Sequence, residues 1–395
     1  MTAILVHHGR SDPLILEVGI GARASEWSGP PGVTGAAAAA LVRAALAAPV
    51  AGPPLPAHAV PGDRVAVAIT GEIPEGDHVV TAVEESLLTA GVAGSDVAVV
   101  VARRGTMPLP PGAVEYQGDA ETDTSYLAAD AAGRPLHLAR TLVDADLVVE
   151  VGGWRWDASL GGADPATALW PAFGRSGCGL AIDRRLARRG RAAIDEWTDS
   201  IHQMRWQLGV LANLRLVAGR GATLHAACFG LPDDAAAAAR KAAGGWRPRI
   251  ESPARLAVAT LSADGPGPAA FTRAVAAAAR VTTPDATICI VGEVAEPGPV
   301  FRRWREGIAV RPLVEEALAG TDRDLIADAV QTRFFAHALG QRRLVLLSTL
   351  ADTLVDELDF GNARTPEAVE RLAARTESLV VLHEADRMLP RCGTT

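Results

Sequence analysis

The stretch that decides the fold of this chain is DADLVVEVGGWRWDASLGGADP, residues 144–165. Its apolar run Leu147–Val151 is typical of a strand in a parallel sheet that is covered on both faces. Two glycine pairs, two tryptophans, an arginine and two aspartates follow this strand directly. Ligands of open α/β sheets bind at the carboxyl ends of the strands. The loop after Val151 is therefore the predicted ligand-binding edge.

A βαβ pattern surrounds this stretch, and two further strands precede it near the N-terminus. The region before it predicts strands at Ala3–Val6, Leu14–Val18, Arg64–Ile69 and Asp96–Ala102, and helices near Val33–Ala48 and at Val79–Ala90. Residues 134–152 resemble one more βαβ unit. After the stretch, the pattern predicts helices at Thr198–Leu211 and Asp233–Ala243 on either side of a hairpin through Leu214–Phe229.

A second βαβ series begins near Arg255, after a polar bridge at Arg247–Pro253. It predicts strands at Leu256–Leu261, Thr287–Val291, Leu344–Ser348 and Leu379–His383, and helices at Ala269–Ala279, Pro312–Ala319, Asp324–Leu339 and Thr365–Thr376. The fold class is thus two α/β domains with mostly parallel sheets and a cleft between them. We expect the domains at 1–250 and 251–376, with a terminal strand in 377–395 that returns to the first domain.

Composition excludes several classes of protein. The 395 residues amount to about two or three domain lengths. A net charge of -8 argues against binding of nucleic acid, which needs a basic face. Four separated cysteines argue against a disulfide framework. Neither a signal peptide nor an apolar run long enough to cross a membrane is present, so we expect a cytoplasmic protein that binds no membrane.

The basic residues are almost all arginine. Of the 38 lysines and arginines, only Lys241 is a lysine. Any chemistry that needs an amine nucleophile or a lysine-tethered cofactor must therefore use Lys241.

Common catalytic and cofactor motifs are missing or fail in context. Gly19–Ala24 fits the dinucleotide pattern G-x-G-x-x-A, but prolines and glycines follow where that site needs a helix, so a loop is predicted. The nine histidines form no pair on one helical face that could bind a metal. The chain has no Walker A sequence and no G-x-S-x-G elbow.

Two loops at the predicted sheet edge supply the candidate site residues. The loop after Val151 offers Trp154, Arg155, Trp156, Asp157 and Asp164. These residues would line a pocket, or the tryptophans would only fill the domain interface; Asp164 could also cap a helix that begins at the following proline. The loop after Ala102 adds Arg103, Arg104 and Thr106, whose arginines would clamp a carboxylate or phosphate, or would be solvated.

With that loop located, the sequence resembles the nickel-dependent lactate racemase family over nearly its whole length. The likeness lies in the order and residue composition of several segments rather than in a catalytic signature. These segments are Ala45–Val50 with Leu55 and Pro61–Val65, Asp144–Val149, Gly161–Gly162, Phe229–Gly230, Phe334–Ala336 and Leu344–Thr349.

The resemblance implies a nickel ion held by a pincer nucleotide on a lysine, with histidines as acid and base in the racemisation of 2-hydroxy acids. The chain departs from the family at the positions that carry this chemistry. Asp164 stands at the tethering lysine, and Ile73 stands at the substrate-binding arginine. The segments that match the family's histidine positions, Trp154–Asp157, 104–108 and 171–201, contain no histidine. The helix Ala274–Ala279 stands at the second domain's lysine.

These departures predict a divergent member of the family that has no nickel-pincer cofactor and binds a small anionic molecule in the cleft. An active nickel-pincer racemase or epimerase is the first alternative. The second is an isomerase that uses Asp157 and Asp164 as acid and base, which carboxyls of different pKa would favour. A non-catalytic partner subunit is the third.

Overall fold

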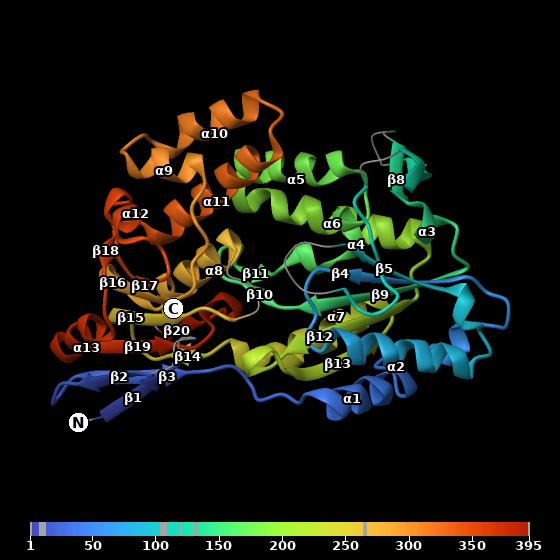
Figure 1. Ribbon diagram of the computed structural model, residues 1–395, viewed down its shortest axis with the longest axis horizontal. Coiled ribbons are helices and arrows are strands. Elements are labelled where there is room, and N and C mark those ends of the chain that lie inside the picture. The colour runs from blue at the N-terminus through green and yellow to red at the C-terminus, as the bar shows by residue number, and fades with distance from the viewer. Residues whose placement is uncertain are drawn as a thin grey trace.

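The structure is a computed structural model that describes residues 2–7, 13–102, 109–118, 121–129, 133, 135–263 and 267–393. Two six-stranded sheets organise the chain (Figure 1). In the described residues, no helix is long and apolar enough to cross a membrane. Arg103, Arg104 and Thr106 lie outside the described residues.

The first sheet has the strand order β13-β12-β9-β4-β5-β6, and only the pair β12–β13 is antiparallel. Helices can pack on both faces of this sheet because successive residues of a strand point to opposite sides. Val149 of β9 packs under α1 and α2, whereas Val148 packs under α4, α5 and α6. The strands are β4 (Val65–Thr70), β5 (Val97–Ala102), β6 (Val114–Glu115), β9 (Leu147–Trp154), β12 (Ala212–Ala218) and β13 (Leu224–Gly230).

Helices cover this sheet on both faces. They are α1 (Gly35–Ala47), α2 (Gly76–Thr89), α4 (Leu169–Ala172), α5 (Ser176–Arg189), α6 (Ile194–Leu208) and α7 (Pro232–Ala242). The predicted βαβ unit at 134–152 is wrong in part. An antiparallel hairpin of β7 (Thr124–Ala129) and β8 (Pro135–Ala139) leads into a single turn of helix, α3 (Arg140–Val143), before β9.

The second sheet has the order β18-β17-β16-β15-β19-β3, and all of its pairs are parallel. Ile288 and Ile290 of β16 face α8 and α11, and Cys289 and Val291 face the opposite core. Its strands are β3 (Arg23–Trp27), β15 (Ala254–Thr260), β16 (Thr282–Gly292), β17 (Arg343–Ser348), β18 (Gly361–Asn362) and β19 (Ser378–Leu382). Its helices are α8 (Pro268–Ala279), α9 (Pro299–Arg305), α10 (Val310–Ala319), α11 (Arg323–Leu339), α12 (Asp352–Glu357) and α13 (Pro366–Arg375).

The two ends of the chain pair with distant segments. Strand β19 lies in the second sheet between β15 and β3, whereas the last strand, β20 (Arg391–Cys392), pairs in parallel with β14 (Arg249–Ile250), at the end of the predicted first domain. The first residues, β1 (Thr2–Val6) and β2 (Leu14–Val18), form an antiparallel hairpin. This hairpin packs with α13 against the second sheet. Figure 1 shows it on the side of the molecule away from α5 and α6. The loop predicted after Gly19 continues into the edge strand β3. Because most residues of β3 are polar, the strand has no hydrophobic pattern from which its pairing with β19 could be predicted.

Candidate functional site

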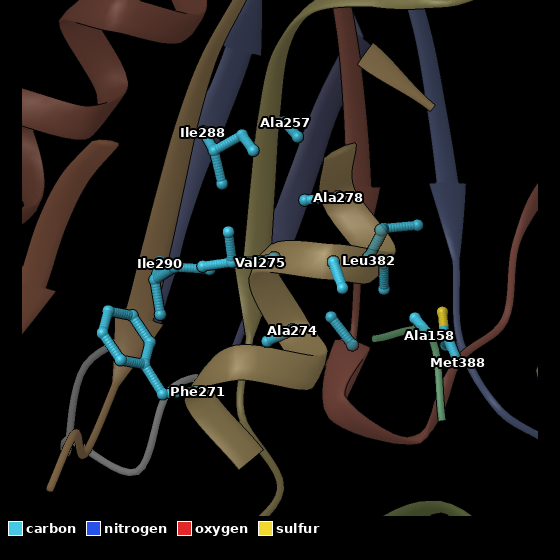
Figure 2. Packing of buried hydrophobic residues seen from close by; sticks show 14 of the residues in the cluster. Ala158, Ala257, Phe271, Ala274, Val275, Ala278, Ile288, Ile290, Leu382 and Met388 are labelled. Atoms are coloured by element: carbon cyan, nitrogen blue, oxygen red, sulfur yellow. The ribbon is translucent and has the colours of Figure 1, made fainter. Parts of the chain in front are cut away.

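The loop after β9 lies between the two sheets. It forms the short hairpin β10 (Trp156–Asp157) and β11 (Gly162–Ala163). Ala158 of this loop packs in the core of the second sheet, and Figure 2 shows it beside Met388 from the C-terminal segment. The carboxyl end of β9 is thus enclosed by residues that come from both halves of the sequence.

The two tryptophans of the loop are mostly packing residues. Their rings meet edge to face at a centroid distance of 4.6 Å. Trp156 is buried, donates its indole N–H to Ala243 O at 2.9 Å and lies under the guanidinium of Arg247. Its polar atom is therefore taken up by the fold, whereas Trp154 reaches the wall of a small cavity.

A cavity of about 480 Å³ lies where the loop faces the second half of the chain. It is lined from the first half by the loop after β9, α5 and α6, and from the second half by the start of α8 and by α11. Its ionisable wall residues are Glu72, Arg155, Asp157, Asp164, Asp183 and Arg273. A smaller cavity of about 90 Å³ shares Glu72, Arg155 and Arg273 with it. Three of the five residues predicted in the loop after β9 thus line the large cavity.

Arg155 and Asp164 form a clamp across the loop. Nε and Nη2 of Arg155 both lie 2.8 Å from Oδ2 of Asp164. Oδ1 of Asp164 accepts a hydrogen bond from Ala166 N, so Asp164 caps the short 3-10 helix Pro165–Thr167, as predicted. Burial opposes the ionisation of Asp164, but Arg155 and Arg273 lower its pKa below the ordinary value. Asp164 is therefore an ionised structural carboxylate.

Asp157 differs from Asp164 although both line the same cavity. Its Oδ1 accepts hydrogen bonds from Ser159 Oγ at 2.5 Å and Leu160 N at 2.9 Å, and Oδ2 accepts none from the described residues. Arg191 holds this turn by donating to Ser159 O. Burial and the neighbouring Asp164 raise the pKa of Asp157 above its ordinary value.

Arg273 on α8 was not among the residues predicted from the sequence. It is 7% exposed, and its Nε donates to Asp386 O at 3.0 Å. Its two terminal nitrogens donate to no described residue, and the residue lines both cavities. Burial and the positive charge of Arg155 lower the pKa of Arg273. One signal was available, because Arg273 is the only charged residue within Pro268–Ala279.

A largely buried ionic cluster holds the end of β9 in place. Glu150 accepts hydrogen bonds from Arg205, Arg215, Asn213 and the backbone N–H of Leu169, at 2.7–3.0 Å. Burial alone would raise the pKa of Glu150, but the two arginines lower it to about 2. Arg215 also donates to Thr167 O, next to the capped turn. The cluster thus fixes the strand end from which the loop departs.

The described residues do not fit a lysine-tethered pincer nucleotide with histidine-ligated nickel. Asp164 stands at the position that the resemblance gives to the tether, and its oxygens are engaged by Arg155 and Ala166. Lys241 is exposed on α7 and is absent from the cavity wall. Within the described ranges, no three His, Cys, Asp or Glu side chains group closely enough to hold a metal ion.

Comparisons with known proteins find a likeness in structure only. No protein-family profile and no curated protein matches the sequence. The lactate racemase apoprotein from Thermoanaerobacterium thermosaccharolyticum aligns with a TM-score of 0.76 and 14% identity, over 99% of this chain and 100% of the other. A structural-genomics protein from Thermotoga maritima aligns with a TM-score of 0.62 and 11% identity, over 85% of this chain and 96% of the other. The predicted lactate racemase-like fold is therefore confirmed, and at these identities the likeness establishes the fold alone.

Proposed function

We propose that this protein is a divergent lactate racemase-like protein that binds a small anionic molecule between its two halves, without the nickel-pincer cofactor. The observation that carries the proposal is the guanidinium of Arg273, which is buried at the cavity wall and whose terminal nitrogens have no acceptor among the described residues. Asp157, Asp386 and Asp164 offset part of the charge of Arg273, but buried donors that make no hydrogen bond still cost free energy. An anion bound at this position would offset that cost.

The neighbours of Arg273 favour the same interpretation. Arg155 lies close enough to lower the pKa of Arg273, and its own charge is shared with Asp164. Asp157 and Asp164 act on both guanidinium groups, and an anion bound between the two arginines would reduce their mutual repulsion further. Arginine is suited to this task because its planar donors match the oxygens of carboxylates and phosphates.

Replacement of Arg273 by alanine tests the proposal. We expect D-lactate, L-malate or inorganic phosphate to bind the wild-type protein, and the variant to bind about 30-fold more weakly or worse. The reason is that the variant lacks the wall arginine whose two terminal nitrogens donate to no described residue. Isothermal titration calorimetry measures the affinities. Arg371→Ala removes the same charge from the exposed face of α13 and serves as the matched control. Equal affinities of wild type and Arg273→Ala for all three anions would overturn the proposal, as would failure of every anion to bind.

A second candidate function is an isomerase that uses Asp157 and Asp164. One observation favours it: the two carboxyls share a cavity wall while their pKa values move in opposite directions. Such divergence allows one carboxyl to donate a proton while the other accepts one.

This second function predicts exchange of a substrate proton in D2O. Between the two pKa values, Asp164 is ionised and Asp157 protonated, so deuterium would enter C2 of D-lactate with loss of optical purity. The rate would fall above the pKa of Asp157 and below that of Asp164. Proton NMR and chiral chromatography measure both changes. A wild-type protein that binds lactate but exchanges no faster than Asp157→Asn would exclude this function.

A further inference from the structure

The large cavity has more room than a small anion takes up. Its volume of about 480 Å³ is the space that about 16 water molecules occupy in the liquid. Lactate or phosphate bound at Arg273 would leave more than half of this space to water. The residues of the remaining wall therefore decide what else a ligand can carry.

Four buried apolar side chains line the cavity from the side of α5, α6 and α11. All four belong to one packed cluster, and each is 4–7% exposed. They are Leu186 of α5, Trp197 of α6, and Val330 and Phe334 of α11. A ligand in the cavity thus meets an apolar surface that several helices share.

These side chains offer a ligand no hydrogen bond. Trp197 is the one with a polar atom, and its indole N–H already donates to Trp170 O at 3.3 Å. Val330 and Phe334 are four residues apart, so both project from one face of α11. Contact between such a surface and water costs free energy in proportion to the area. An apolar group in the cavity would remove that contact.

The packing of α8 against α11 holds Arg273 and the apolar surface at one cavity. Phe271 of α8 and Phe335 of α11 meet at a centroid distance of 4.8 Å, and Figure 1 shows the two helices side by side. Arg273 follows Phe271 by two residues, and Phe334 directly precedes Phe335. Arg273 and Phe334 both line the large cavity. A bound molecule therefore meets a guanidinium on one helix and apolar side chains on the next.

The acidic residues of the wall argue against a second negative charge on the ligand. Its carboxyl groups are those of Glu72, Asp157, Asp164 and Asp183. A second carboxylate would lie near some of these groups, and like charges repel each other. It would also lose its hydration at the apolar surface. The wall thus favours a single negative charge and an apolar remainder.

We propose that the anion is a monocarboxylate with an apolar chain. Its carboxylate lies on Arg273, and its chain lies along Leu186, Trp197, Val330 and Phe334. This inference rests on the proposed function and adds the nature of the rest of the molecule to it. Pentanoate and hexanoate are simple representatives of the class, and both remain small anions.

A series of carboxylates of increasing length tests the inference. Isothermal titration calorimetry with propionate, butanoate, pentanoate and hexanoate is expected to show about 3- to 4-fold tighter binding for each added methylene. The physical reason is that each methylene is buried against the apolar surface. Glutarate has the length of pentanoate but ends in a second carboxylate, so we expect it to bind about 10-fold more weakly than pentanoate or worse.

Three variants assign the affinity to its groups. Val330→Thr keeps the shape of the side chain but places a hydroxyl in the wall, so pentanoate should bind about 5-fold more weakly and propionate within about 2-fold of wild type. Val300→Thr is the matched control, because Val300 is also 4% exposed and in the same cluster but does not line the cavity. Arg273→Ala should weaken all members of the series by a similar factor. Thermal unfolding of each variant reports whether it is folded.

The outcomes separate the two proposals. Affinities that do not rise along the series, with every member dependent on Arg273, would overturn this inference and leave the anion-binding function standing. Glutarate that binds as tightly as pentanoate, or equal losses of pentanoate affinity in the two threonine variants, would have the same consequence. If no monocarboxylate of the series binds while phosphate does, only this inference fails. If lactate, malate and phosphate also fail to bind, both proposals fail.

Discussion

Replacement of Glu150 by glutamine is expected to lower the free energy of unfolding by about 3–5 kcal/mol at pH 7. Glu150 is fully buried and is the shared counter-ion of Arg205 and Arg215, whose side chains are 11% and 3% exposed. Glutamine keeps the shape but removes the counter-charge that both guanidinium groups share. Urea denaturation followed by circular dichroism measures the difference.

The pH dependence gives this prediction a second, independent test. Since the pKa of Glu150 is about 2 in the folded protein and about 4.5 in the unfolded chain, its stabilisation is complete above pH 4.5 and is lost as the pH falls toward 2. The gap in stability between wild type and Glu150→Gln should therefore shrink over that range.

A surface variant is the matched control for Glu150→Gln. Glu315 pairs with Arg311 on the exposed face of α10, with side chains 64% and 89% exposed. Glu315→Gln should change the free energy of unfolding by less than about 0.5 kcal/mol. A loss at Glu150 as small as the loss at Glu315 would contradict the role of the buried cluster.

Replacement of Gly152 by valine is expected to destabilise the protein by about 3 kcal/mol or more. A β-carbon at Gly152 would meet Thr167 O at 2.7 Å, and the side chains of Thr70 and Arg215 from other sides. Thr70 and Arg215 both donate to Thr167 O, so the intruding side chain would displace a bonded network rather than a flexible tip. Thermal unfolding measures the loss.

The second glycine pair of the loop provides the control for Gly152. A β-carbon at Gly162 would meet no atom within 4 Å. Gly162→Ala should therefore change the free energy of unfolding by about 0.5 kcal/mol or less. If Gly162→Ala and Gly152→Val behaved alike, the close approach at the end of β9 would not be the reason for a glycine at position 152.

Most elements of the fold were predictable because each carries its own pattern. The apolar strand after Arg64 and the alanine-rich helix that ends at Ala279 correspond to β4 and α8. The hairpin through Leu214–Phe229 is confirmed as β12 and β13. Edge elements were missed for a physical reason: β3 is bonded on one side only, so most of its residues are polar and show no alternation.

The candidate site was predictable only in part. The loop after β9 could be placed at the sheet edge, because the end of a parallel strand has a known relation to ligand sites. Within that loop, the different surroundings of Asp157 and Asp164 depend on contacts with Ser159, Arg155 and Arg273. Sequence spacing contains no information about the last of these contacts.

The sequence by itself determined the two βαβ series, their order, the glycine-framed loop and the scarcity of lysine. The alternation of apolar and polar residues, together with composition, is sufficient to predict these features, because each element shows its pattern within about 20 neighbouring residues. Only the tertiary structure decided that β3 and β19 join the second sheet and that Arg273 and Asp157 line one cavity. Parallel pairing and cavity walls join residues far apart in the chain, and their free energy comes from partners that no local pattern specifies.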